Sequence, residues 1–191
     1  MLQGQTDVWP HRRKPDKHVA QFLLCSYAAR TMQAPAPILD DPDLKAARGV
    51  ARGISRLFAR NDIWCLPEMP LRNARRADLM GIDAKGHLII VEIKVSRADL
   101  LGDAKWGDYL DYCDRFYWGL APHLDRACME APAFLPERCG LIVADAYDAE
   151  VLRPAPLVPL NAARRKVETE RLARAALRRS LILGDPEAGT T

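Results

Sequence analysis

The spacing of apolar residues predicts a helix and then three strands in the first part of the chain. Within 44–60, Val50, Ile54 and Leu57 recur at helical intervals and give that helix one apolar face. Runs rich in β-branched and other apolar residues then predict three strands, at 63–71, 77–83 and 87–95. Only about three residues separate the last two strands, so these should pair as an antiparallel hairpin.

The second half of the chain predicts a helix, a buried strand and a basic helix. Ser96 is a candidate N-cap for a long helix reaching about residue 120, with a core face of Trp106, Leu110, Cys113 and Tyr117. The apolar stretch 140–146 predicts a buried strand with a short partner at 150–153, and Asn161 can cap a helix that ends near residue 183. This order predicts an α/β fold, a mixed central sheet flanked by helices.

The two ends of the chain lie outside this pattern. A helix is expected at 16–32, and the proline-broken stretch 34–43 (APAPILDDPD) reads as a linker. We therefore expect an N-terminal arm over 1–43, one domain over 44–183 and a disordered tail over 184–191.

Composition narrows the class of protein. The 191 residues are 49% hydrophobic and 28% charged, which is the balance of a globular domain with a substantial core. No run approaches the roughly 18–20 apolar residues of a membrane span, and the N-terminus lacks the apolar segment of a secretory signal. A cytoplasmic protein without a membrane partner is expected. The five cysteines form no CxxC pair, which predicts reduced and mostly buried thiols rather than a zinc site.

The charge is distributed unevenly. A net charge of +3 is too small to indicate a nucleic-acid partner by itself. Basic residues gather at His11–Lys14, Arg48–Arg60 and Arg164–Arg179, whereas acidic residues gather at Asp40–Asp43 and Asp99–Asp114. Such segregation is typical of a positive binding surface, although solvated helix faces produce the same pattern.

Two carboxylates and a lysine should converge at one end of the predicted hairpin. If residues 84–86 form the loop, the register places Asp78 opposite Glu92. Directly opposed side chains lie about 5 Å apart on the same face of a sheet. Strand alternation puts Lys94 beside Glu92 on that face as well.

This constellation fits a divalent metal site. Two carboxylates at such a distance repel each other, and a cation between them removes the conflict. Mg²⁺ prefers oxygen ligands and needs only one or two protein carboxylates beside substrate phosphates, and Mn²⁺ accepts the same ligands. Lys94 would orient or deprotonate the attacking water. The residues therefore indicate phosphodiester hydrolysis, and a solvent-exposed Glu–Lys pair at a strand end is the alternative.

The motif Asp78…Glu92-Ile-Lys94, on the second and third strands after a helix, resembles the PD-(D/E)xK nuclease superfamily. Two longer strings are similar to the MmcB family of bacterial DNA-repair proteins. They are IVEIKVSRADLLGDAKWGDYLDYCDRFYWGL at 90–120 and GLIVADAYDAEVLRPAP at 140–156, within a resemblance that covers roughly 45–182. It implies a restriction-endonuclease-like αβββαβ core, with Asp78 and Glu92 as metal ligands and Lys94 as the catalytic lysine.

The resemblance leaves a third carboxylate open. Many superfamily members carry an acidic residue in the first core helix, but 44–60 has none. Glu68, on the strand beside Asp78, is the candidate third metal ligand, with a surface role or a strand-end hydrogen bond as the alternative. Three later residues are expected to form an exposed acidic face, with Asp103 as a minor metal candidate: Asp99, Asp103 and Asp108.

Five side chains are candidate DNA contacts. Lys105-Trp-Gly-Asp-Tyr109 resembles the Q-x-x-x-Y element of nucleases like RecB, with lysine in the glutamine position. One helical turn apart, Lys105 and Tyr109 would both reach a phosphate; a solvated lysine and a tyrosine at the core edge are the alternative. Arg76 precedes the site aspartate, and Arg52 and Arg56 belong to the basic helix; all three would hold DNA backbone through salt-sensitive contacts.

Together these features predict a DNA nuclease that depends on Mg²⁺ or Mn²⁺, with DNA and other repair proteins as partners and a nucleoid-associated location. The repair role follows from the resemblance alone. Two rival interpretations remain: a DNA-binding module that keeps the fold without efficient turnover, and a structural partner in a repair complex.

Overall fold

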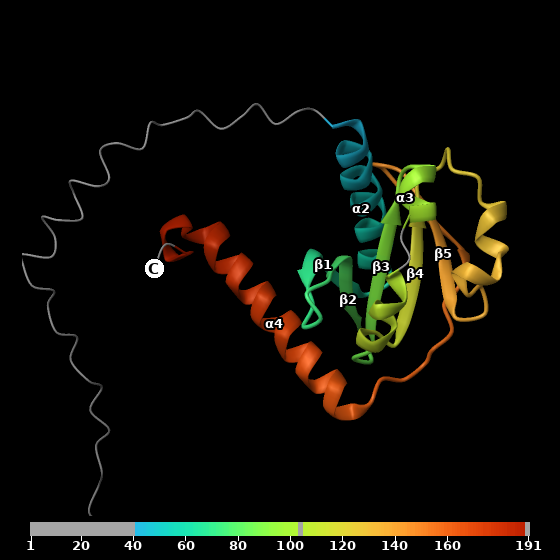
Figure 1. Ribbon diagram of the computed structural model, residues 1–191. Helices are drawn as coiled ribbons and strands as arrows, with labels where there is room; N and C mark the ends of the chain where they lie inside the picture. The colour runs from blue at the N-terminus through green and yellow to red at the C-terminus, as the bar shows by residue number, and fades with distance from the viewer. Residues whose placement is uncertain (1–40, 103–104, 190–191) are drawn as a thin grey trace, which may run out of the picture. The chain divides into compact units, whose positions relative to one another are not determined.

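The computed structural model describes residues 41–102 and 105–189, which contain one mixed six-stranded sheet flanked by helices (Figure 1). The helix expected at 16–32 lies outside the described residues. None of the helices in the described part of the chain combines the length and apolarity that a membrane crossing needs.

The sheet is ordered as the strands occur in the chain, from β1 to β6. The pairs β3–β4 and β4–β5 are parallel and the other pairs are antiparallel. In chain order, with η for 3-10 turns, the elements are α2 (Pro42–Arg60), β1 (Ile63–Pro70), β2 (Arg76–Asp83), β3 (Leu88–Lys94), α3 (Arg97–Gly102), η1 (Trp106–Tyr112), β4 (Arg115–Leu120), η2 (Ala127–Glu130), η3 (Pro132–Phe134), β5 (Cys139–Ala144), β6 (Ala149–Arg153), α4 (Ala162–Gly184) and η4 (Pro186–Gly189). The succession from α2 to β4 is the expected αβββαβ core.

The hairpin of β2 and β3 has the predicted register. Leu79 pairs with Val91, and the Asp83 N–H donates to the His87 carbonyl at 3.1 Å, which closes the loop where the sequence predicts it. Gly86 in that loop has a φ of 80°, a left-handed conformation that glycine adopts at little cost. The strand ends that carry Asp78 and Glu92 therefore lie side by side.

The long helix expected from residue 96 to about 120 is wrong. Only Arg97–Gly102 forms an α-helix there, and Arg115–Leu120 forms β4 in the middle of the sheet. Every residue of Phe116–Leu120 is buried because β4 is covered on both faces. A strand buried in this way reads as a continuous apolar run, and periodicity alone does not distinguish such a run from a buried helix.

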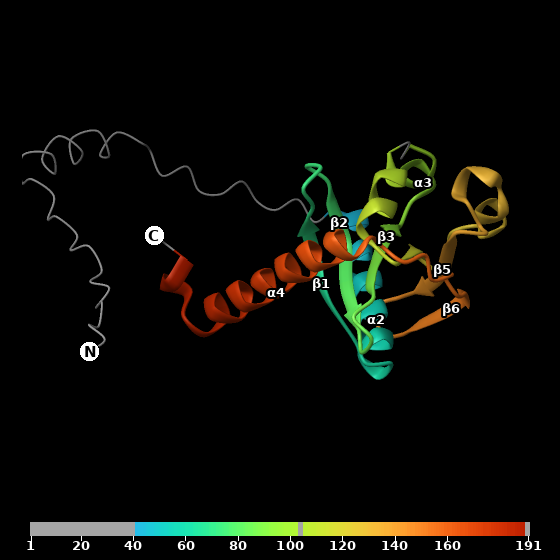
Figure 2. The same ribbon diagram turned by 90° about the horizontal axis from the view of Figure 1, so that it is seen from below.

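The helices α2 and α4 cover opposite faces of the sheet (Figures 1 and 2). On the α2 side, a Cβ built at Gly119 would lie 2.7 Å from Ile54 Cδ1 and 3.0 Å from Val91 Cγ1. On the α4 side, Leu172 and its neighbours line an apolar groove together with Leu66. Because side chains alternate along a strand, the even-numbered residues of β3 face the α4 side.

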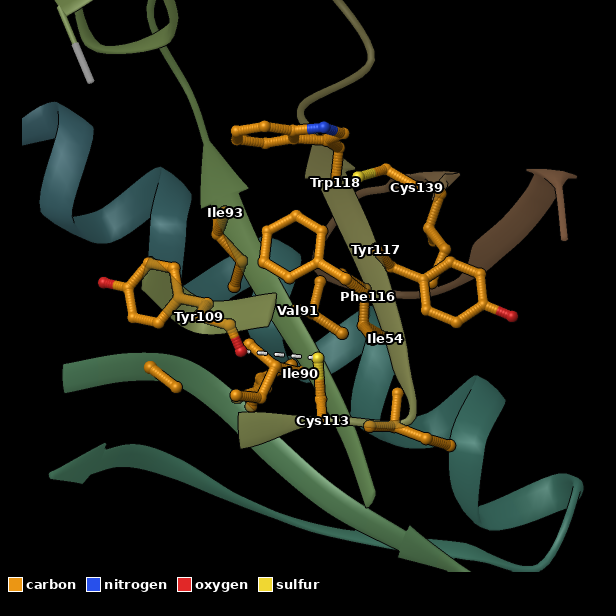
Figure 3. Close-up of a cluster of buried hydrophobic side chains, with 14 of the residues drawn as sticks. Ile54, Ile90, Val91, Ile93, Tyr109, Cys113, Phe116, Tyr117, Trp118 and Cys139 are labelled. Atoms are coloured by element: carbon orange, nitrogen blue, oxygen red, sulfur yellow. Dashed lines mark hydrogen bonds between the residues drawn. The ribbon is translucent and has the colours of Figure 1, made fainter. Parts of the chain in front are cut away.

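An aromatic cluster fills the core on the α4 side of β4 (Figure 3). The ring centroid of Trp106, from η1, lies 5.5 Å from that of Phe116 and 4.9 Å from that of Trp118. Tyr109 stacks on Phe116 at 6.3 Å. The predicted shared helical face of Trp106, Cys113 and Tyr117 is thus replaced by contacts between η1 and β4, which hold η1 against the sheet beside Glu92.

Candidate active site

Asp78, Glu92 and Lys94 meet on the α4 side of the sheet, at the end of the β2–β3 hairpin. The pair Leu79–Val91 places Asp78 across from Glu92. The Lys94 Nζ lies 3.3 Å from Glu92 Oε1, and the two side chains are only 3% and 9% exposed. The three side chains therefore share one face, as strand alternation predicts.

The carboxylate of Asp78 links β2 to β3 at the end of the hairpin that lies away from the loop. Its Oδ2 accepts a hydrogen bond of 2.7 Å from the backbone N–H of Ile93. Burial, the largest influence, raises the pKa of Asp78 above its usual value, and the nearby charge of Asp99 acts in the same direction. The Ile93 N–H and Lys94 favour the charged form and only partly offset that rise. An additional cation would stabilise the ionised carboxylate.

Asp99 joins this group, although the sequence places it on an exposed acidic face. Its Oδ1 lies 3.4 Å from Lys94 Nζ, and its side chain is 46% exposed. Ser96 Oγ accepts a hydrogen bond of 3.3 Å from the Asp99 backbone N–H and so caps the first turn of α3. The short sequence distance between Lys94 and Asp99, with a helix cap between them, is the signal that points to this contact.

The donor atoms at the site fit Mg²⁺ or Mn²⁺ with two protein ligands. Asp78 and Glu92 supply carboxylate oxygens from facing strand positions, and such hard donors suit these ions. Within the described residues no three His, Cys, Asp or Glu side chains are gathered to hold a metal ion. A site of two carboxylates, completed by water and substrate phosphate, is consistent with both observations.

The structure does not bring Glu68 into this group. Glu68 lies on β1 at the position facing Asp78, between the pairs Pro67–Leu79 and Met69–Ala77. Its φ of 49° is left-handed, and its side chain is 59% exposed and lies 3.5 Å from Arg76. This geometry agrees with the alternative interpretation of Glu68, a role at the protein surface.

Two of the cysteines in the described part of the chain, Cys113 and Cys139, are buried in the core. Cys65, Cys113, Cys128 and Cys139 are all free thiols. Burial raises the pKa of Cys113 and of Cys139 to about 12, so both remain protonated near neutral pH.

Residues 34–187 match the family described as DNA repair protein MmcB-like. The chain belongs to the MmcB-like family. No match is found among curated proteins. A solved structure, described as the SPO1766 protein of unknown function from Silicibacter pomeroyi, is similar to this MmcB-like chain with 41% identity and a TM-score of 0.64. That similarity covers 72% of this chain and 90% of the other.

In this MmcB-like protein, Tyr109 and Arg76 lie next to the site, and the Tyr109 side chain contacts the backbone of Arg76. Tyr109 is 7% exposed, and its hydroxyl donates to the Arg76 carbonyl at 3.1 Å. Because η1 is a 3-10 turn that begins at Trp106, Lys105 and Tyr109 do not lie one α-helical turn apart. Lys105 is exposed at the start of η1. Tyr109 thus occupies the core-edge position that was the alternative for it.

Arg52 and Arg56 lie on α2, on the face of the sheet opposite Glu92 and Lys94. Arg56 donates to the carbonyls of Ala146 and Tyr147 at 3.3 and 3.1 Å, in the turn between β5 and β6. Arg52 is exposed. The structure therefore separates these two candidate DNA contacts from the hairpin end.

Proposed function

We propose that this MmcB-like protein hydrolyses DNA phosphodiester bonds with Mg²⁺ or Mn²⁺. The observation that carries the proposal is the convergence of Asp78, Glu92 and Lys94 on one face, with the Lys94 amine 3.3 Å from Glu92. The repair context comes from the family, and the reaction class from the chemistry of these three groups.

Each residue has a role that follows from its position. Asp78 and Glu92 would hold the ion, which neutralises charge on the phosphate and lowers the pKa of a water molecule. Lys94, buried and held between two carboxylates, would orient that water and stabilise negative charge that develops on the phosphate oxygens. The water oxygen would bond to phosphorus as the bond to the 3′ oxygen breaks, and the proton that the water loses would be balanced by the proton that the departing 3′ oxygen takes up. The products are 5′-phosphate and 3′-hydroxyl ends.

The rim of the site offers contacts for the substrate. Arg76 is exposed next to the hairpin end, and Lys105 is exposed at the start of η1. We assign both to the DNA backbone on either side of the scissile bond, where they would act as salt-sensitive contacts that do not read sequence. Tyr109 would act by fixing the backbone of Arg76.

A cleavage panel tests the proposal. Purified protein is incubated with single-stranded, double-stranded and branched DNA in Mg²⁺, Mn²⁺ or EDTA, beside Asp78→Asn, Glu92→Gln and Lys94→Met, which preserve side-chain size. We expect metal-dependent cleavage that falls at least ~100-fold in each variant. Identical purification of the variants controls for contaminating nucleases.

A second candidate is a DNA-binding module without turnover. The observation that favours it is that no three metal-binding side chains gather among the described residues. The same panel separates the two candidates. DNA binding without metal-dependent cleavage of any substrate would select the non-catalytic module. Cleavage that survives unchanged in all three variants would show that Asp78, Glu92 and Lys94 do not carry the activity.

A further inference from the structure

The helix α4 crosses β1, the terminal strand of the sheet, and is held there by arginines. Figures 1 and 2 show α4 beside β1, which is the terminal strand of the sheet. Arg171 donates to the Pro70 carbonyl at 2.8 Å, and Arg179 donates to the carbonyls of Pro67 and Glu68 at 2.6 and 3.2 Å. These bonds satisfy carbonyls of an edge strand and fix the position of the helix.

Two further arginines on α4 have a different environment. Arg174 and Arg178 are exposed, lie one helical turn apart, and make no hydrogen bond or ion pair with any described residue. Like charges at this spacing repel each other by a few tenths of a kcal/mol. A bound anion would remove that repulsion.

These arginines line a groove between α4 and the end of β1. Its volume is about 510 Å³. Its lining contains three arginines and no acidic residue: Pro70, Arg174, Ala175, Arg178, Arg179 and Ile182. A concave surface with several guanidinium groups and no carboxylate suits a phosphate backbone, because guanidinium binds phosphate through paired hydrogen bonds.

The helix that lines the groove packs on the same face of the sheet as the candidate active site. Leu66 on β1 faces α4, and Leu66 pairs with Met80, which in turn pairs with Ile90 on the face of Glu92. One strand, β2, separates β1 from β3.

We infer that Arg174 and Arg178, in the groove beside the β1-bound Arg179, form the docking surface for the DNA backbone that leads to the hairpin end. The inference rests on the proposed function for its ligand, and it replaces the α2 arginines with α4 arginines as the main backbone contacts. On α2, Arg56 already binds the β5–β6 turn, on the opposite face of the sheet. The α4 arginines line a groove, and their helix packs on the face of the sheet that carries Glu92.

The test measures DNA binding in the absence of cleavage. Fluorescence anisotropy with a labelled duplex of about 20 base pairs, in EDTA and over a series of salt concentrations, compares the full chain with Arg174→Gln/Arg178→Gln. We expect an affinity loss of roughly tenfold or more, and a salt slope smaller by about 2 because two phosphate contacts are removed. Lys85→Gln/Arg126→Gln removes the same charge at two other exposed positions and should bind like the unmodified chain.

Four outcomes decide the inference. A selective loss in the α4 variant, with an unchanged melting temperature, supports it. An equal loss in the Lys85/Arg126 control, or no loss in the α4 variant, overturns it. A loss in Arg48→Gln/Arg52→Gln but not in the α4 variant also overturns it and restores the α2 helix as the DNA contact. The binding assay involves neither metal nor cleavage, so its result can be interpreted even if the nuclease assay fails. If cleavage is retained but the α4 variant binds DNA normally, the docking surface is wrong and the proposed nuclease function is not.

Discussion

The amine of Lys94 lies 3.4 Å from the Oδ1 of Asp99, so α3 contributes a carboxylate to a group that otherwise comes from two strands. Lys94 is 3% exposed and would be costly to bury as a lone charge. Glu92 on the strand and Asp99 on the helix both offset that cost. We therefore expect Asp99 to act as a positioning residue for the proposed catalytic lysine.

Replacement of Asp99 by asparagine should weaken catalysis without removing it. We expect Asp99→Asn to lower the cleavage rate about 10- to 100-fold, as is typical for residues that orient groups at a metal site. Because the charge of Asp99 raises the pKa of Asp78, the acid limb of the pH–rate profile should move to lower pH in the variant. The measurement is cleavage rate against pH in saturating Mn²⁺.

The matched control for that change is Asp111→Asn. Asp111 is an exposed acidic residue of η1, and its replacement removes the same charge. It should leave both the rate and the profile unchanged. An identical rate loss in the two variants would mean that Asp99 acts only through its charge and not by positioning Lys94.

Metal binding and pH should be linked through Asp78. Its pKa is raised in the folded protein, so its contribution to the free energy of unfolding is complete below the ordinary value of 3.8 and is lost as pH rises through the folded value. A divalent ion binds only the ionised carboxylate. The rise in melting temperature on addition of MnCl₂ should therefore be larger at about pH 8 than at about pH 5.

Asp78→Asn is the decisive comparison for this linkage. The variant keeps the side-chain shape but lacks the titrating group, so both the Mn²⁺-dependent shift and its pH dependence should disappear. An equal shift at the two pH values, or a shift that persists in the variant, would show that Mn²⁺ binds elsewhere.

The sequence predicted the hairpin and its register because both depend on local features. A three-residue loop, strand alternation and two carboxylates at mirrored distances from the loop are enough to place Asp78 across from Glu92. The helix α2 followed from its periodicity in the same way. Its first residue is Pro42, two positions before the expected start, because Asp41 caps it by accepting from the Asp43 N–H.

The contacts of η1 and α4 depended on tertiary structure and could not be predicted in the same way. The burial of β4 on both faces erased the alternation that would have identified it as a strand. The end of β3 and the Ser96 cap were predicted, but the contact between Asp99 and Lys94 depends on how α3 packs against the end of β3. Which of the basic helices shares a face with Glu92 depends on packing, and the sequence pattern had assigned the DNA contacts to Arg52 and Arg56 of α2.

Asp114 joins three distant segments, and its loss should destabilise the fold. Its buried carboxylate accepts from the backbone N–H groups of Leu88 and Leu160, each at 2.8 Å, and from Arg165 at the start of α4. Burial alone would raise the pKa of Asp114, but the Arg165 and backbone hydrogen bonds hold it below its usual value. Its stabilising effect is therefore present above the ordinary value of 3.8 and is lost as pH falls through the folded value.

For Asp114→Asn we expect the free energy of unfolding to fall by about 2 kcal/mol, less than for a fully buried ion pair because Arg165 is 30% exposed. Urea denaturation at neutral pH measures this change, and Asp111→Asn should stay within about 0.5 kcal/mol of the unmodified chain. The difference in the free energy of unfolding between the unmodified chain and Asp114→Asn should shrink as the pH is lowered toward 3.8 and below. A constant difference down to acid pH would contradict the assigned role of the charge.

Gly53 sits where α2 crosses the turn between β5 and β6. A Cβ at this position would lie 2.3 Å from the Asp145 carbonyl oxygen and 2.6 Å from that of Asp148. Within a helix, glycine to alanine normally stabilises by about 1 kcal/mol. Here the overlap is with backbone rather than with a flexible side chain, and overpacking of this kind costs about 1–3 kcal/mol. Gly53→Ala should therefore lower the melting temperature, whereas Gly184→Ala, with nothing within 4 Å, should not. Stabilisation by Gly53→Ala would mean that α2 does not approach the β5–β6 turn as closely as the fold requires.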